Sequence, residues 1–162
     1  MDGDERRPGA GGAEAATTVV CLVTVRNRAA ALVDDLDAMA EFADAVVALD
    51  DGSTDETGLI LRAHQLVRLA LANRVREHDA GGHECNNRNR LLTAAAELRP
   101  QWIISLDQGE RIGSSDAMAL RRFVTDEALP GCAYGFQRFE MGAGETFDPS
   151  FEWAYRLFPF RL

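Results

Sequence analysis

Short apolar runs alternate with amphipathic segments over most of this chain. Apolar or β-branched runs cover Thr17–Val25, Ala45–Leu49 and Trp102–Leu106, as is typical of strands buried on both faces of a sheet. After the first run, apolar residues recur at helical spacing from residue 29 to about residue 42. The pattern therefore predicts strands and helices in alternation.

A second helix is predicted after the turn that follows Leu49. Ser53 and Glu56 have the spacing of a capping box, in which each side chain bonds the other residue's backbone N–H. The expected packing face of this helix consists of Leu59, Ile60, Leu61, Leu66, Val67 and Leu69. We expect a short strand over residues 74–78 and a polar loop over residues 79–87.

The alternation continues to the end of the chain. A helix is expected over Arg88–Leu98, and Ser114 or Ser115 is expected to cap another that ends near Glu127. Two late strands, at residues 132–141 and 151–160, flank a glycine-containing loop.

These elements predict an α/β fold. Each connection between the early strands is long enough for a helix, so the sheet should be mainly parallel and covered on both faces. Residues 1–16 are rich in Gly, Ala and charge, and we expect a disordered tail there. Residues 17–162 are then one domain.

Composition narrows the choice of ligands. The net charge of −9 argues against a nucleic-acid partner, because neutralising phosphates requires a basic face. All 17 basic residues are Arg, which excludes a Schiff-base lysine and a Walker-type phosphate loop. An anionic ligand would therefore need a metal ion or a local arginine cluster.

The cysteines and the N-terminus bear on the compartment. Cys21 and Cys132 lie in apolar runs and are expected to be buried free thiols, which fits a reducing environment. The first 16 residues lack the apolar core of a signal peptide, and no stretch has the length of a transmembrane segment. We expect a cytoplasmic protein.

Two of the predicted strands run directly into carboxylates. One strand ends at Asp50 and Asp51, and the other ends at Asp107, with Glu110 three residues later. At the carboxyl edge of one sheet, such groups suit Mg²⁺ or Mn²⁺ held together with substrate phosphates. The alternative for the first pair is turn and capping chemistry in Asp-Gly-Ser-Thr-Asp.

Other polar residues offer weaker signals. Arg26, Arg28, Arg88 and Arg90 are expected near the same edge, either to meet phosphate oxygens or to solvate the surface. His78, His83 and Cys85 match no closed zinc site, so a surface loop with histidines is the better interpretation.

The motifs resemble those of the family 2 glycosyltransferases of the GT-A fold, chiefly their N-terminal nucleotide-sugar-binding portion. The matching stretches follow in the family's order over roughly residues 17–160: Val23–Asn27, Val46–Asp55, Arg88–Asn89, Trp102–Arg111 and Trp153–Phe158. The last of these is similar to the Arg-Leu-Phe segment of a bacterial branch that builds surface polysaccharide.

The resemblance implies a GT-A, Rossmann-like three-layer sandwich and the residues of its site. The implied contacts to a UDP-, GDP- or dTDP-linked sugar are Asn27, Asp50, Asp51, Ser53, Arg88 and Asp107. Asp107 and Glu110 would hold Mg²⁺ or Mn²⁺, and Asp148 or Glu152 would be the base. The implied reaction is an inverting transfer of the sugar to a glycan, lipid or small-molecule acceptor.

Two departures from the family pattern keep other functions open. Gly109 stands where the family has its second metal carboxylate. The chain is also short for the family, so a partner chain could complete the acceptor site. The main alternative is a degenerate or truncated, non-catalytic domain that binds nucleotide or a protein. A nucleotidyltransferase is a third, although the glycines expected after the first strand are missing.

Overall fold

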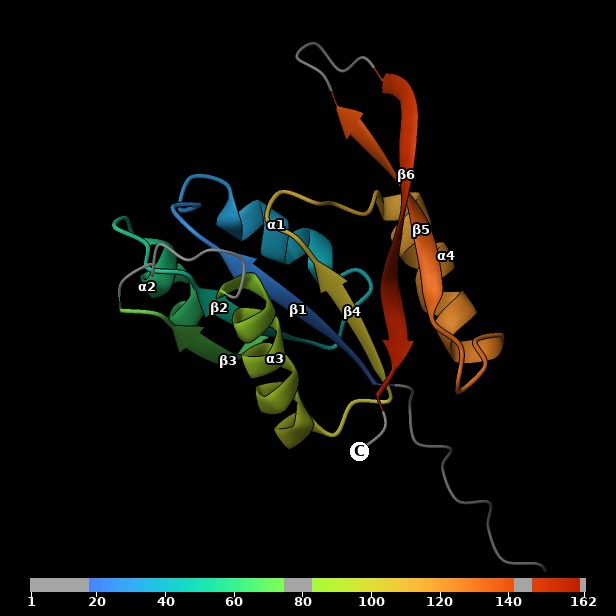
Figure 1. Ribbon diagram of the computed structural model, residues 1–162, viewed down its shortest axis with the longest axis horizontal. Helices are drawn as coiled ribbons and strands as arrows, with labels where there is room; N and C mark the ends of the chain where they lie inside the picture. Colours follow the sequence, from blue (N-terminus) through green and yellow to red (C-terminus); the bar gives the residue numbers. More distant parts are fainter. Residues whose placement is uncertain (1–17, 75–82, 142–146, 161–162) are drawn as a thin grey trace, which may run out of the picture.

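A six-stranded sheet forms the middle layer of the molecule (Figure 1). The computed structural model describes residues 18–74, 83–141 and 147–160, without the side chains of residues 141 and 147–151. The elements are β1 (Val19–Val25), α1 (Leu32–Met39), β2 (Ala45–Asp50), α2 (Thr57–Ala63), β3 (Val67–Ala72), α3 (His83–Ala95), the 3₁₀ turn η1 (Ala96–Leu98), β4 (Trp102–Leu106), α4 (Ser114–Asp126), β5 (Tyr134–Met141) and β6 (Phe147–Pro159).

The strand order is β3-β2-β1-β4-β6-β5. The pairs β1–β2, β1–β4 and β2–β3 are parallel, whereas β6 runs antiparallel to both β4 and β5. The long β5–β6 hairpin projects beyond the helices (Figure 1). The predicted mainly parallel, mixed sheet is confirmed.

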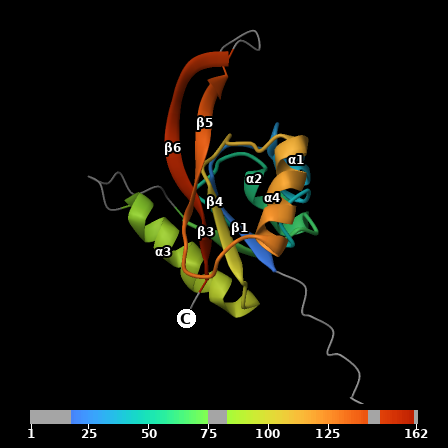
Figure 2. The same cartoon turned by 90° about the vertical axis from the view of Figure 1, so that its right-hand side faces the viewer.

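Helices cover both faces of this sheet (Figure 2). Leu36, Leu61 and Leu120, from α1, α2 and α4, belong to one buried cluster. Leu91 and Ala95 of α3 belong to a second cluster on the opposite face. Alternate side chains of the central strands feed the two clusters, because successive residues of a strand point to opposite faces. The predicted three-layer arrangement is confirmed.

The strand register brings the candidate acidic turns together. Val25 at the end of β1 pairs with Asp50 at the end of β2, and Val23 pairs with Leu106 at the end of β4. Because these three strands are parallel, the loops that follow them meet at one edge of the sheet.

The middle of the chain differs from the prediction. The second helix ends at Ala63, and the residues expected on its later packing face, from Val67 onward, form β3. Their alternation of apolar and polar side chains has the strand period of two rather than the helical one. The short strand predicted at residues 74–78 is therefore wrong at Arg74, and residues 75–82 lie outside the described part. Helix α3 begins at His83, so the loop predicted up to residue 87 is also too long.

Both predicted serine caps are wrong. The N-cap of α2 is Glu56, with no side-chain capping bond, and the N-cap of α4 is Gly113. Ser114 instead donates its hydroxyl to Glu41 Oε1 at 3.0 Å. In each case the serine side chain forms a hydrogen bond with a residue distant in the sequence rather than with the helix end that the local pattern predicted.

The cysteines divide between the interior and the surface. Cys21 is buried, as predicted, and burial raises the pKa of its thiol. Cys132 is exposed, so the prediction of a second buried thiol is wrong, because β5 begins only at Tyr134. The predicted tail at residues 1–16 lies outside the described residues. Among those described, no helix has the length and apolar character needed to cross a membrane.

Candidate active site

The acidic turn after β2 holds the loop after β1. The backbone N–H of Asn27 donates to Ser53 Oγ at 3.0 Å, and Thr54 N–H donates to Asn27 Oδ1 at 2.8 Å. Arg28 N–H donates to Thr57 Oγ1 at 2.7 Å. Asn27 has the left-handed φ of 47°, a conformation that Asn tolerates well. The Asp-Gly-Ser-Thr-Asp turn thus sets the shape of the first loop.

Asp50 and Asp51 point to different surroundings. Asp50 Oδ1 accepts the N–H of Ser53 at 2.9 Å, and a Cβ built on Gly58 would lie 2.6 Å from Asp50 Oδ2. Asp50 therefore packs under the first turn of α2, the turn-forming alternative raised by the sequence. Asp51 lines a cavity instead.

A polar network surrounds Asp51. Its Oδ1 accepts from Asn73 Nδ2 at 2.7 Å and from Asn87 Nδ2 at 3.3 Å, and His83 Nε2 lies at 2.7 Å. Burial alone would raise the pKa of Asp51, but these hydrogen bonds together lower it below its usual value. Asp51 is held as a carboxylate. His83 belongs to this network, so its assignment to a surface loop is wrong.

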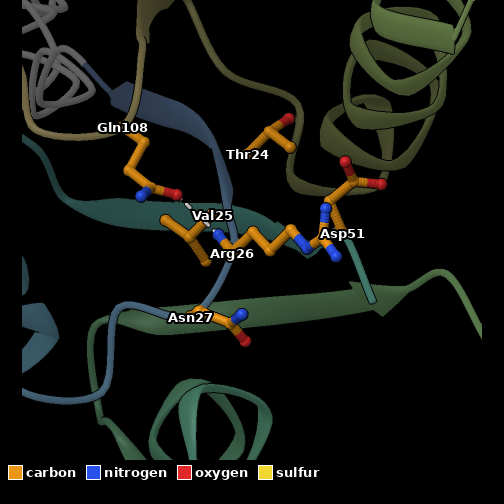
Figure 3. Close-up of a pocket in the computed structure, with 6 residues that line it drawn as sticks. All are labelled: Thr24, Val25, Arg26, Asn27, Asp51 and Gln108. Atoms are coloured by element: carbon orange, nitrogen blue, oxygen red, sulfur yellow. Dashed lines mark hydrogen bonds between the residues drawn. The ribbon is translucent and has the colours of Figure 1, made fainter. Parts of the chain in front are cut away.

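The cavity beside Asp51 has a volume of about 440 Å³ (Figure 3). Its lining comes from the ends of three strands: Thr24, Val25, Arg26, Asn27, Asp51 and Gln108. Figure 3 shows the Arg26 side chain extending across the cavity toward Asp51. Arg26 Nε is buried and finds no hydrogen-bond partner among the described residues. A buried donor of this kind suits a ligand that supplies an acceptor.

A second cavity, of about 310 Å³, adjoins the first. Thr24 and Gln108 line both cavities, which makes them neighbours along the strand edge. Arg88 of α3 and Asp107 line the second. The structure thus brings the predicted residues together in two groups, Asn27 with Asp51 and Arg88 with Asp107, and leaves Asp50 and Ser53 in the supporting turn.

Arginines surround the acidic pair after β4. Arg156 Nη2 lies 2.6 Å from Asp107 Oδ2 and 2.5 Å from Glu110 Oε1. Arg138 Nη1 lies 3.4 Å from Glu110 Oε1, and Arg88 Nη2 lies 3.4 Å from Asp107 Oδ1. Burial lowers the pKa of Arg156, but its bonds to Glu110 and Asp107 outweigh that effect and raise it.

These contacts bear on the predicted metal. The remaining oxygen, Glu110 Oε2, accepts the backbone N–H of Asp107 at 2.8 Å, so every carboxylate oxygen of the pair has a donor. Among the side chains that the structure describes, no group of three or more from His, Cys, Asp or Glu gathers to hold a metal ion. The residues present do not fit Mg²⁺ or Mn²⁺ in this arrangement. The ion at Asp107 and Glu110 stays a prediction, and it would have to displace Arg156.

Gly109 lies between these two acids. Its φ is 85°, and a Cβ built there would lie 3.9 Å from Arg28 Nη2. Arg28 Nε is held at 2.8 Å by the buried Asp35, which also binds Arg111 Nη2 at 2.6 Å. Asp35 therefore ties the first loop to the segment after β4.

The two predicted base residues lie on β6. The side chain of Asp148 lies outside the described part of the structure. Glu152 is 74% exposed and forms an ion pair with Arg138. Both residues stay candidates for the base.

Several residues of the site were not predicted. Asn73 and Asn87 carried no sequence signal, because their role depends on where β3 and α3 lie relative to Asp51. Arg156 falls in the Arg-Leu-Phe segment already matched, which was the available signal. Arg138 could be found only through the pairing of β5 with β6, where it stands opposite Glu152.

Comparisons with known proteins bear on the fold. No family model matches the sequence, and no curated protein sequence matches it either. A crystal structure of residues 1–349 of TarS from S. aureus, a family 2 glycosyltransferase, matches with a TM-score of 0.52 and 19% identity over 67% of this chain. A second TarS structure matches with a TM-score of 0.49 and 22% identity, covering 64% of this chain and 19% of the TarS chain. The present chain spans 32% of the first TarS structure. The likeness supports a GT-A-like α/β fold for this chain.

Proposed function

We propose that this chain is a GT-A-type glycosyltransferase domain that binds a nucleotide-diphospho-sugar. It transfers the sugar, with inversion, to a hydroxyl group of a glycan, lipid or small-molecule acceptor. The observation that carries the proposal is the pair of adjoining cavities at the carboxyl ends of β1, β2 and β4. Ligands of open α/β sheets bind in that position.

The first cavity suits the nucleoside. Asp51, kept ionised by its network, would accept hydrogen bonds from the base or the ribose. The unpartnered Arg26 Nε would donate to a carbonyl or hydroxyl oxygen of the same group. A carboxylate acceptor and a guanidinium donor in one cavity match the mixed edge of a nucleobase.

The second cavity suits the diphosphate. Arg88 lines it, with its side chain 46% exposed and its contact to Asp107 at 3.4 Å. In the proposed reaction the acceptor oxygen forms a bond to the anomeric carbon. The bond from that carbon to the diphosphate oxygen breaks, and its electron pair leaves with the diphosphate. Asp148 or Glu152 would take the hydroxyl proton, as a general base.

A non-catalytic, nucleotide-binding domain is the second candidate. Gly109 and the arginine-filled acidic pair favour it, because both depart from the expected metal site. In the enzyme, we propose that a partner chain completes the acceptor site. The free thiols of Cys21, Cys85 and Cys132 are compatible with a cytoplasmic location for either candidate.

Calorimetry with UDP-glucose, GDP-mannose and dTDP-glucose tests the donor site. We expect one nucleotide class to bind, and Asp51→Asn to weaken that binding by about tenfold or more, the loss expected when a charged hydrogen-bond acceptor is neutralised. The matched control is Asp126→Asn at the exposed end of α4, which should bind like the wild type. Failure of all three nucleotides to bind would overturn the proposal. Release of free sugar or transfer to an acceptor separates the enzyme from the non-catalytic domain.

A further inference from the structure

We propose that Arg156 is the resident cation of the acidic pair, and that the donor diphosphate binds to arginine side chains without a divalent metal. The diphosphate would meet Arg156 together with Arg88. This inference rests on the proposed function for the identity of the ligand. The occupation of the acidic pair by Arg156 can be tested without any nucleotide.

Arg156 lies where a cation bridging the two acids would bind. A single nitrogen, Nη2, lies within 2.6 Å of both Asp107 Oδ2 and Glu110 Oε1. A bridging cation would have to occupy that point between the two carboxylates. The Arg156 side chain is only 11% exposed, and it reaches the pair from β6, a separate strand with its own place in the sheet. The guanidinium is thus anchored by the fold.

Every oxygen of the acidic pair already has a contact with a hydrogen-bond donor. Magnesium and manganese take several oxygen ligands at once and usually keep water or phosphate at the rest. Here each carboxylate oxygen contacts a donor, which is a guanidinium group or the backbone N–H of Asp107. The arginines are Arg88, Arg138 and Arg156. A metal would have to remove Arg156 first, leaving that guanidinium buried without its partners, which is costly.

The position between the acids points the same way. Gly109 supplies no carboxylate, and the nearest side-chain atom to a Cβ built there is Arg28 Nη2, at 3.9 Å. Arg28 cannot move freely toward it, because Asp35 holds its Nε at 2.8 Å. A guanidinium group therefore lies beside Gly109 and another contacts both acids, where a metal would need oxygens.

Guanidinium groups can serve the diphosphate directly. Their planar fork binds phosphate oxygens through paired hydrogen bonds, with a charge that does not titrate near neutral pH. Arg88 already lines the second cavity, and Asp107 beside it contacts Arg156. Arg156 itself does not line the cavity, so a diphosphate bound there would meet Arg88 directly and would reach Arg156 beside Asp107.

Manganese binding tests the first half of the proposal. Electron paramagnetic resonance of Mn²⁺ should find no site in the wild type at the acidic pair. Arg156→Gln should create one, and adding Asp107→Asn to that variant should abolish it. A Mn²⁺ site in the wild type that Asp107→Asn removes would overturn the proposal, as would its absence from folded Arg156→Gln.

Nucleotide binding tests the second half. Calorimetry with the same three nucleotide-sugars, in EDTA and in Mn²⁺, should give equal affinities for the wild type. Arg156→Gln should weaken binding in EDTA by about tenfold or more, the loss expected for a charge-assisted contact. The matched control is Arg121→Gln. Arg121 lines neither cavity and binds Asp44 at a distance of 2.8 Å, so this variant should leave nucleotide binding unchanged.

The outcomes separate this inference from the proposed function. Nucleotide binding that requires Mn²⁺ leaves the glycosyltransferase proposal standing and overturns the role of Arg156. Equal binding by the wild type and Arg156→Gln in EDTA also overturns it. No binding in either medium overturns the proposed function itself. If circular dichroism shows that Arg156→Gln does not fold, Arg156→Lys decides: it keeps the charge and loses the fork, and its affinity in EDTA should still fall.

Discussion

The acidic turns after β2 and β4 stand at the same edge of one sheet, yet their carboxylates have different partners. Asp51 receives hydrogen bonds from the amides of Asn73 and Asn87 and lies against His83. Asp107 and Glu110 are met by guanidinium groups. The hydrogen bonds from the two asparagines help keep Asp51 ionised without adding a charge of their own. Arginines neutralise the charge of Asp107 and Glu110, so that end of the site favours an anionic ligand.

The two regions are joined through one buried carboxylate. Asp35 of α1 binds Arg28 from the first loop and Arg111 from the segment after β4. Burial would raise the pKa of Asp35, but the bonds from Arg28 and Arg111 outweigh it and lower the pKa. Loss of Asp35 should therefore disturb both regions.

Asp35→Ala should have the largest effect on stability. It leaves two guanidinium groups without their partner, and we expect the free energy of unfolding to fall by roughly 2–3 kcal/mol, below the range for fully buried pairs because both arginines are partly exposed. Urea unfolding at neutral pH measures the loss. A fall equal to that of a surface Asp37→Ala control would contradict the link between the two regions.

The pH dependence of that loss is a second check. Because the folded pKa of Asp35 lies below 3.8, the ordinary value for an aspartate, its contribution to stability is fully present above that value. The contribution is lost as the pH falls below 3.8 and through the folded pKa. The difference in stability between the wild type and Asp35→Ala should therefore be constant near neutrality and shrink in acid.

Asp51→Asn should affect the first region alone. The amide cannot take the hydrogen bonds of Asn73, His83 and Asn87 in the same way, and the free energy of unfolding should fall by about 1–2 kcal/mol. Thermal unfolding measures this loss. The Mn²⁺ response of Arg156→Gln should survive in the double variant, because that site lies in the second region. Its disappearance would show that the two regions are not independent.

Gly109→Asp restores the carboxylate that the family pattern expects in the second region. At a φ of 85° a side chain is strained, so we expect a loss of about 1 kcal/mol, although Asp tolerates this conformation better than most residues. While Arg156 is present, the variant should gain no Mn²⁺ binding. Tight Mn²⁺ binding by Gly109→Asp alone would show that Arg156 yields readily to a metal.

Ser53→Ala should have the smallest effect. It removes the acceptor for the Asn27 N–H in an exposed loop, where water replaces it, so we expect a loss of about 0.5 kcal/mol. Hydrogen exchange of the Asn27 amide should rise, while exchange in β4 stays unchanged. Unaltered exchange at Asn27 would contradict the role of Ser53 in holding the first loop.

Much of the fold could be predicted from local patterns. The buried runs that became β1, β2 and β4 are continuous and β-branched, and such runs have few alternatives in a sheet with helices on both faces. The prediction for β3 was wrong because Val67–Ala72 follows helix α2 after only three residues, and the apolar residues of this segment extend the helical pattern. The predicted caps were wrong because Ser53 and Ser114 form hydrogen bonds with residues far away in the sequence.

The candidate site divides in the same way. The positions of Asp51, Arg88 and Asp107 at one edge follow from the order of parallel strands. The partners of these residues do not, since Asn73 follows β3 and both Arg138 of β5 and Arg156 of β6 reach the site only when the sheet is assembled.

An α/β sheet with two acidic turns at one edge can be predicted from the amino-acid order, because the spacing of apolar residues and the residue types at strand ends are local properties. Long-range packing places Asp50 under α2, Asp51 beside a cavity and Arg156 between Asp107 and Glu110. The sequence around a carboxylate does not show whether that carboxylate binds a metal ion or an arginine. The carboxylate's partner is whichever cation the packing of distant strands brings within reach.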